Sequence, residues 1–267
     1  MLIDTHCHLD APAFEPDRPQ VLARAANCGV RAIVVPAVVP ANFEAVISLA
    51  AQNPSLTYAL GVHPLFTTGL PADWLDQLRA ALQQRRDDPQ LVAIGEIGLD
   101  FFVKDLDPVV QESVYVEQLK LAVEFDLPVL LHVRRSQDRL LKYLRQLPVR
   151  GGIAHAFNGS VQQATQFIDR GFALGFGGAM SFERARQIRR LVADLPETAH
   201  VLETDAPDMA PEWHGAGRNE PGELAKLAGV FAQLRGLSVA QVSAQTAVNA
   251  RRVLPRLDRW LEQYLPQ

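Results

Sequence analysis

Short apolar runs recur along this chain, and amphipathic segments separate them. The runs cover 2–8, 31–38, 57–64, 91–98, 128–133, 151–157, 172–176 and 200–207. Most of them are nearly continuous in Val, Ile, Leu and Ala, as expected for strands of a parallel sheet that is covered on both faces. The alternation therefore predicts an α/β protein with eight strands, each followed by a helix.

Helical patterns occupy the segments between these runs. One begins near Asp17, others cover 108–125, 136–147, 160–169 and 182–194, and an apolar stripe at helical spacing covers 224–234. Ser238 and Gln241 predict a capping box that opens one more helix. The pattern favours a single (β/α)8 TIM-barrel domain over 1–267. The alternative is an open doubly wound sheet, but such sheets usually have fewer strands, and their phosphate-binding glycine motif is absent after the first run.

Composition narrows the possible partners. A net charge of −4 excludes a general basic coat, so nucleic acid would have to be held by local contacts. No apolar run reaches the roughly 18 residues that a membrane helix needs, and the start lacks the basic segment of a signal peptide. The two cysteines make no disulfide framework. We therefore expect a cytoplasmic protein with no membrane partner, and a monomer.

Ionisable side chains gather at the ends of the apolar runs. His6 and His8 close the first run, and their i, i+2 spacing in a strand places them on one face. The later runs end in His63, Glu96, His132, His155 and the pair Glu203 and Asp205. The active site of such barrels lies at the carboxyl ends of the strands. Five of the seven histidines fall there, which predicts a metal site at that rim.

The residue types predict two divalent ions. Four imidazoles (His6, His8, His132, His155) with two or three carboxylates exceed what one catalytic ion needs. Glu96 is the best candidate for a bridge, because its strand lies between the other ligand-bearing strands around the ring. Imidazole and carboxylate suit Zn²⁺, Mg²⁺ or Mn²⁺. We expect the ions to activate a water that Asp205 orients or deprotonates.

Other polar residues leave alternatives open. Glu203 shares a face with the carboxylate two residues later, so it is expected to pair with a histidine, an arginine or a metal-bound water; a purely structural role is the alternative. For His63 a contact with a substrate phosphate, or a role behind the ligands, is favoured over metal binding. Arg134 lies two residues after His132 and can reach the site. Gly175 leaves room for substrate or shapes a turn.

With these residues in view, the chain resembles the TatD family of metal-dependent deoxyribonucleases, among the amidohydrolase-like barrels. The likeness runs through IDTHCHLD, GVHP, GEIGLD, LHVR, HAFNGS, LETDAP and RNEP, in the family's order and over essentially the whole chain. The resemblance implies that His6, His8 and Asp205 hold one ion, that His132 and His155 hold the other, that Glu96 bridges, that Glu203 assists catalysis, and that His63, Arg134 and Asn219 approach the substrate.

The resemblance also implies a reaction: exonucleolytic hydrolysis of DNA from a 3′ end, on single strands, with Mg²⁺ or Zn²⁺. A second hypothesis keeps the metal site but assigns it a small phosphoester, amide or lactone. Related barrels with that chemistry often carry a carboxylated lysine on strand 4, so Glu96 favours the nuclease. A third hypothesis is a non-catalytic binding protein, which is disfavoured because every expected ligand is present.

Overall fold

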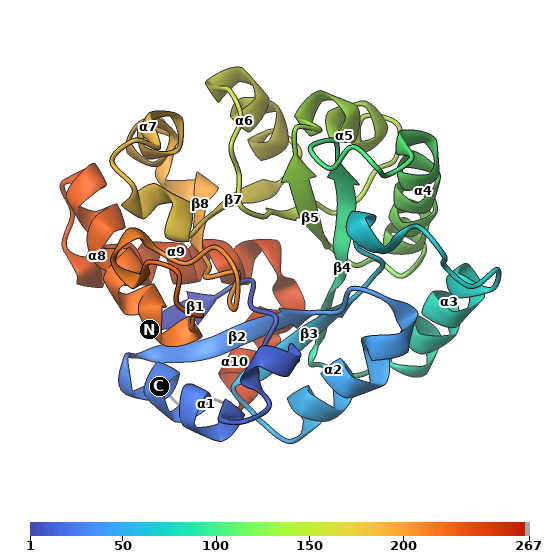
Figure 1. Cartoon of the computed structure of the whole chain (residues 1–267), viewed down its shortest axis with the longest axis horizontal. Helices are drawn as coiled ribbons and strands as arrows, with labels where there is room; N and C mark the ends of the chain where they lie inside the picture. Colours follow the sequence, from blue (N-terminus) through green and yellow to red (C-terminus); the bar gives the residue numbers. More distant parts are fainter. Residues whose placement is uncertain (265–267) are drawn as a thin grey trace.

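The computed structural model describes residues 1–264, and within this range eight strands form one sheet in the order β1 to β8 (Figure 1). They are β1 (Leu2–Asp4), β2 (Val30–Pro36), β3 (Leu56–Leu60), β4 (Leu91–Asp100), β5 (Val129–Arg134), β6 (Gly152–Ala154), β7 (Phe172–Phe176) and β8 (His200–Leu202). Neighbouring strands pair in parallel. The backbone amide of Thr5 donates to the carbonyl of Leu202, which closes the ring. The predicted single-domain α/β barrel is confirmed; residues 265–267 of the predicted domain lie outside the described residues.

Helices surround the ring of strands (Figure 1). They are α1 (Arg18–Asn27), α2 (Phe43–Ala51), α3 (Trp74–Gln84), α4 (Pro108–Glu124), α5 (Gln137–Leu144), α6 (Val161–Ile168), α7 (Arg186–Asp194), α8 (Leu224–Arg235), α9 (Val239–Val253) and α10 (Pro255–Tyr264). The predicted capping box is present, since Ser238 Oγ accepts from the amide of Gln241. The sequence did not predict α10, which begins on a proline.

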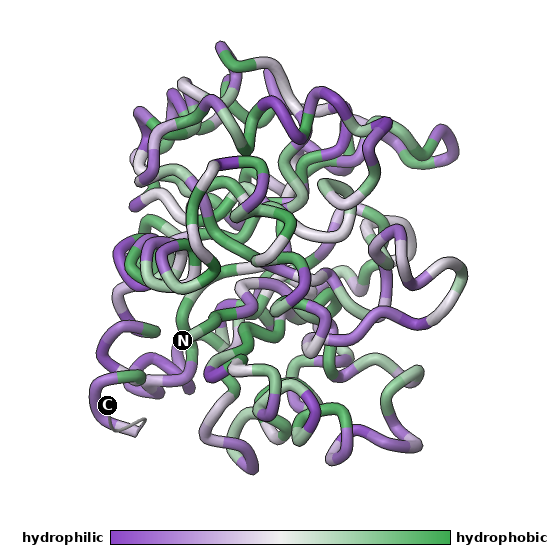
Figure 2. Tube along the Cα trace, turned by 90° about the vertical axis from the view of Figure 1, so that its left-hand side faces the viewer, coloured by the Kyte–Doolittle hydropathy of each residue, from purple (hydrophilic) through white to green (hydrophobic). Residues whose placement is uncertain are grey.

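The last two helices close one mouth of the barrel. Ala250 and Leu254 at the end of α9, and Leu257 of α10, pack with side chains such as Ile3 and Val34 that fill the barrel interior. These helices lie at the amino ends of the strands, because Trp260 Nε1 donates to the carbonyl of Pro54, just before β3. Hydrophobic segments run through the inside of the trace in Figure 2. A polar site therefore has only the opposite, carboxyl-end mouth available.

Four strands, β1, β3, β6 and β8, end earlier than predicted, and the expected site residues follow them in irregular backbone. β1 ends at Asp4, and in the irregular segment that follows, the backbone amide of His8 donates to the carbonyl of Ala206. Ala156 and Asp205 adopt positive φ angles of 45° and 56°. Such angles are strained for residues other than glycine, and they cluster at functional sites. None of the helices in residues 1–264 is long and apolar enough to cross a bilayer.

His200 is a buried histidine that lies away from the predicted ligands. It opens β8 and packs between the rings of Phe176 and Phe231, at centroid distances of 5.5 and 5.1 Å. Burial, and after it the charge of Arg235, lowers the pKa of His200 from 6.5 to about 4. The imidazole is therefore neutral in the folded protein under conditions in which it is protonated in the unfolded chain.

This histidine predicts a loss of stability in mild acid. As pH falls from 6.5 to 4, the unfolded state binds the proton first, so the free energy of unfolding decreases by about 3 kcal/mol from this group. We expect urea unfolding to show a smaller decrease over this range in a His200→Phe variant, whose ring fits the same aromatic surroundings. Parallel decreases in the two proteins would contradict the prediction.

Candidate metal centre

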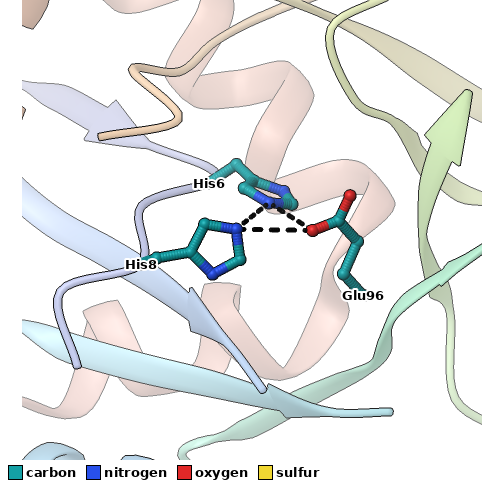
Figure 3. A group of neighbouring side chains, drawn as sticks. All are labelled: His6, His8 and Glu96. Carbon is teal, nitrogen blue, oxygen red and sulfur yellow. Dashed lines mark hydrogen bonds and ion pairs between the residues drawn. The ribbon is translucent and has the colours of Figure 1, made fainter. Parts of the chain in front are cut away.

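A first group of ligand atoms forms where the segments after β1 meet β4. His6 Nε2 lies 3.0 Å from Glu96 Oε2 and 3.3 Å from His8 Nε2, and His8 Nε2 lies 3.4 Å from Glu96 Oε2 (Figure 3). Asp205, after β8, adds Oδ1 at 3.7 Å from His6 and 3.6 Å from His8. Ligands of a tetrahedral Zn²⁺ at about 2.1 Å are spaced by about 3.4 Å, so the ligand atoms of His6, His8 and Glu96 have the spacing of a metal site.

Hydrogen bonds within the protein do not account for this group. A neutral imidazole carries one N–H, yet His6 Nε2 faces a second imidazole nitrogen and two carboxylate oxygens. His6 and Glu96 are almost completely buried, so water does not separate them. A shared cation satisfies such a set of lone pairs, and the donor chemistry therefore fits a divalent metal.

A second group forms on the other oxygen of Glu96. Glu96 Oε1 lies 2.9 Å from His132 Nδ1 and 3.4 Å from His63 Nε2, and these two nitrogens are 3.1 Å apart. One carboxylate thus directs each of its oxygens at a different pair of histidines. This is the arrangement expected of a carboxylate that bridges two ions.

His155 lies closer to the first group than the resemblance implied. Its ring stacks on His6 with centroids 3.7 Å apart, and its Nε2 lies 3.5 Å from Asp205 Oδ2. Among the described residues, its direct polar contacts are with carboxylates of the β8 loop and not with His132. Asp205 therefore has one oxygen toward His6 and His8 and the other toward His155, so it also lies between two groups of imidazoles.

The contacts of His63 decide which of its nitrogens carries the proton. The backbone amide of Leu65 donates to His63 Nδ1 at 3.1 Å. Burial lowers the pKa of His63, and its neutral ring must then carry its proton on Nε2. That nitrogen faces Glu96 and the second group. His63 is thus arranged to donate a hydrogen bond to the centre, although its Nε2 also lies in a group with Glu96 and His132 that could hold an ion.

Two further carboxylates lie behind the histidines. Asp100 Oδ2 accepts from His132 Nε2 at 3.1 Å, which leaves the Nδ1 lone pair of His132 free for an ion. Glu203 Oε1 lies 3.0 Å from His155 Nδ1 and accepts from the amide of Ala156 at 2.6 Å. The predicted pairing of Glu203 with a histidine is thus present. A Cβ at Gly175 would overlap the Glu203 carboxylate, so this glycine makes room for that side chain.

The charges of the centre stabilise one another. Burial opposes ionisation, but His155, His6 and His8 together lower the pKa of Asp205 to about 2. Burial likewise opposes protonation of His8, yet Glu96 and Asp205 raise its pKa to about 9. In the absence of metal, protons on the imidazoles therefore compensate the carboxylates. Positive charge is required at this position, whether protons or divalent ions carry it.

Of the two other residues expected to approach the substrate, Arg134 lies at the cleft and Asn219 does not. Arg134 lines the open cleft above the centre, a cavity of about 1250 Å³, and its side chain is 48% exposed. Asn219 is completely buried. Its Nδ2 donates to the carbonyls of Thr204 and Asp208, and its Oδ1 accepts from the amide of Glu220. The side chain of Asn219 thus braces the loop that follows β8 and is not brought to the cleft.

Asp100 is the contributor that the sequence reasoning missed. The motif GEIGLD contains the signal, because residues 96 and 100 have the same parity in one strand and point to the same face. Burial opposes its ionisation, but His132 and two backbone amides lower the pKa of Asp100, so it stays charged. Asp4 was also missed. It ties β1 to the β8 loop through the amide and hydroxyl of Thr204.

Comparison with known proteins shows the family to which the chain belongs. The profile of the family described as TatD related DNase matches residues 3–255. The chain belongs to the TatD family of metal-dependent hydrolases. It is 43% identical, over 87% of its length and 90% of the relative's, to an uncharacterized metal-dependent hydrolase of Escherichia coli, YjjV. The crystal structure of that homologue superposes with a TM-score of 0.91, at 39% identity over 95% of this chain and 98% of that one.

A second relative carries a named activity. The chain is 34% identical to the 3′-5′ ssDNA/RNA exonuclease TatD of Erwinia tasmaniensis, over 94% of this chain and 99% of that protein. Membership of the TatD family and metal-dependent hydrolysis are therefore established for this chain by likeness along its whole length.

The two groups predict separable losses of metal. Elemental analysis of the purified protein should give about two ions per chain. We expect His8→Ala and His132→Ala each to reduce this to about one, because each removes a ligand from a different side of Glu96. His214→Ala is the control, since that ring bonds to the carbonyl of Arg218, outside the centre. Full metal content in both variants would contradict the assignment.

The carboxylate behind His132 predicts a subtler effect. Asp100→Asn keeps the shape of the side chain but removes the charge that orients His132. We expect metal affinity to weaken by about 10- to 100-fold for one of the two ions, as measured by calorimetric titration of the metal-free protein. The exposed Asp105 provides a matched control, and Asp105→Asn should leave both affinities unchanged. Equal affinities in Asp100→Asn and wild type would contradict this role.

Proposed function

We propose that this TatD-family protein is a two-metal phosphodiesterase that removes nucleotides from the 3′ ends of single-stranded DNA. The proposal rests on the position of Glu96, because its two carboxylate oxygens face different groups of histidines. A pair of ions on one carboxylate is the arrangement that enzymes use to cleave phosphodiesters. The activity named for the Erwinia relative supports the same substrate class.

The ligand sets follow from the contacts. His6, His8 and Asp205 would hold one ion with Glu96 Oε2, and His132 would hold the other with Glu96 Oε1. His155, whose Nε2 faces Asp205 Oδ2, would complete the second set, as the family resemblance implies. Zn²⁺, Mg²⁺ or Mn²⁺ held there supplies Lewis-acid chemistry, which polarises the phosphate and activates water. The number of imidazoles favours Zn²⁺ among these ions.

Protein side chains orient the water, accept its proton and contact the phosphate. Asp205, ionised at neutral pH, orients the attacking water and accepts its proton. Glu203 acts through His155, because it is buried behind that ring. His63 donates from Nε2 to a phosphate oxygen, and Arg134 neutralises phosphate charge at the cleft.

The decisive test is a cleavage assay on single-stranded DNA labelled at its 5′ end. The protein loaded with Mg²⁺, Mn²⁺ or Zn²⁺ should shorten the strand stepwise from its 3′ end. Chelation should stop the reaction, and Glu96→Ala should reduce kcat by at least about 1000-fold because both ions lose a shared ligand. Glu117→Ala, on the exposed side of α4, should retain wild-type activity and serves as the control.

One result would overturn the proposal, and two further results would decide between the alternatives. Intact DNA with every metal would exclude the nuclease. Rapid hydrolysis of a small phosphoester, amide or lactone by the same preparation would then favour the alternative amidohydrolase-like activity. Binding of DNA without turnover, unchanged in His132→Ala, would instead indicate a binding protein that does not use the centre.

A further inference from the structure

An aromatic side chain stands at the rim of the cleft, directly after β4. Phe102 is 45% exposed, which is unusual for a phenylalanine so close to a polar centre, and it lines the same cavity as His132. No role in holding metal accounts for it. Phe66, 46% exposed in the short helix Pro64–Phe66, is a second ring lining that cavity.

Hydrogen bonds at the carboxyl ends of the paired strands β4 and β5 hold the backbone that carries the Phe102 ring. Asp100 pairs with Arg134 at the ends of β4 and β5, and the amide of Phe101 donates to the carbonyl of Arg134. Asp100 Oδ1 then accepts from the amides of Phe102 and Val103, at 2.8 and 3.1 Å. Phe102 therefore lies on a turn held by side-chain and ladder hydrogen bonds and not on a free loop.

Two guanidinium groups lie against this ring. The Arg134 Cζ is 3.9 Å from the Phe102 ring centroid, and the Arg135 Cζ is 4.7 Å from it. Arg135 has a positive φ of 56°, which is strained for an arginine. Contacts of this kind between cations and an aromatic face hold the guanidinium groups in place while leaving them at the surface of the cleft.

One carboxylate connects this cluster to the metal centre. Asp100 Oδ2 accepts from His132 and lies 3.6 Å from Arg134 Nη1, while its other oxygen holds the turn of Phe102. The ring, the guanidinium and the ligand of the second group are thus fixed relative to one another. The cluster is immediately next to the centre, where a bound polymer would continue.

We propose that Phe102, Arg134 and Arg135 form a base-stacking subsite for a single-stranded nucleic acid whose 3′ end occupies the metal centre. The inference rests on the proposed nuclease function and names where its substrate is gripped. Proteins that bind single strands without sequence preference combine exposed aromatic rings with positive charge along the backbone path. Here the part of the Phe102 ring that the two guanidinium groups leave exposed takes a base, and the guanidinium groups face the adjoining phosphates.

Charge favours a nucleic acid over a peptide as the occupant. The protein as a whole carries a net charge of −4, yet two adjacent arginines meet at this part of the rim. A local positive group beside a phosphodiester-cleaving centre suits a polyanion, and a flat exposed ring suits a base. The subsite predicts stacking without selection among the four bases.

The test compares Phe102→Ala with wild type on two labelled strands. One strand carries normal nucleotides, and the other has abasic sugars over its last four positions. We expect Phe102→Ala to raise KM for the normal strand by roughly 5- to 100-fold with little change in kcat, and to leave the abasic strand unaffected. Phe102→Trp should restore the wild-type KM. Metal content should be unchanged in both variants, which excludes damage to the centre.

A matched control comes from another phenylalanine that lies under an arginine. Phe182 has the Arg184 Cζ at 5.1 Å from its ring centroid but does not line the cleft. Phe182→Ala should leave KM for both strands at the wild-type value. An equal rise of KM on both strands in Phe102→Ala, or no rise on either, would overturn the subsite.

Binding measurements separate this inference from the proposed function. Fluorescence anisotropy of a labelled ten-nucleotide strand is measured with the metal-loaded protein. If wild type cleaves the strand and Phe102→Ala binds and cleaves it equally well, the subsite is excluded and the nuclease function stands. If wild type binds the strand without cleaving it, and Phe102→Ala binds it more weakly, the nuclease function is excluded and the subsite stands. Absence of both binding and cleavage in wild type removes both.

Discussion

The structure depends on a buried carboxylate that is shared by imidazoles from separate strands. Glu96 is almost completely buried, and its two oxygens lie within 3.4 Å of nitrogens from His6, His8, His63 and His132. Burial of a charge without compensation is strongly unfavourable, so the arrangement requires positive charge between these groups. That single requirement explains why the polar ends of several strands converge at one mouth of an otherwise apolar barrel.

Around this carboxylate the site has a layered construction. The inner layer consists of imidazoles, and behind it Asp100 and Glu203 contact the outer nitrogens of His132 and His155. Such outer carboxylates orient the rings and leave the inner nitrogens free to bind a cation. Asp100 has a second role, because its other oxygen holds the turn that carries Phe102. The orientation of a ligand and the shape of the cleft are thereby coupled through one side chain.

The ionisable side chains can gather at one mouth of the barrel because apolar side chains fill the other mouth. The ends of α9 and α10 insert apolar side chains beneath the strands, so the interior is filled and only the carboxyl ends meet solvent. Closure between β1 and β8 also serves the site. Asp4 bonds to Thr204, and the amide of Asp205 donates to the carbonyl of His6, which brings the first and last ligands of the chain together.

The sequence determined the class of fold and which ionisable side chains gather at one rim. Apolar runs in alternation with amphipathic segments specify strands and helices locally, and histidines or carboxylates at the run ends identify one rim, because parallel strands end at one edge. Tertiary structure alone decided the partners. Three such contacts depend on loops whose irregular backbone no sequence periodicity describes. His155 stacks on His6, Asn219 hydrogen-bonds to backbone groups, and His63 carries its proton on Nε2. Periodicity fixes which face a side chain occupies, but contacts across the rim are set by packing in three dimensions.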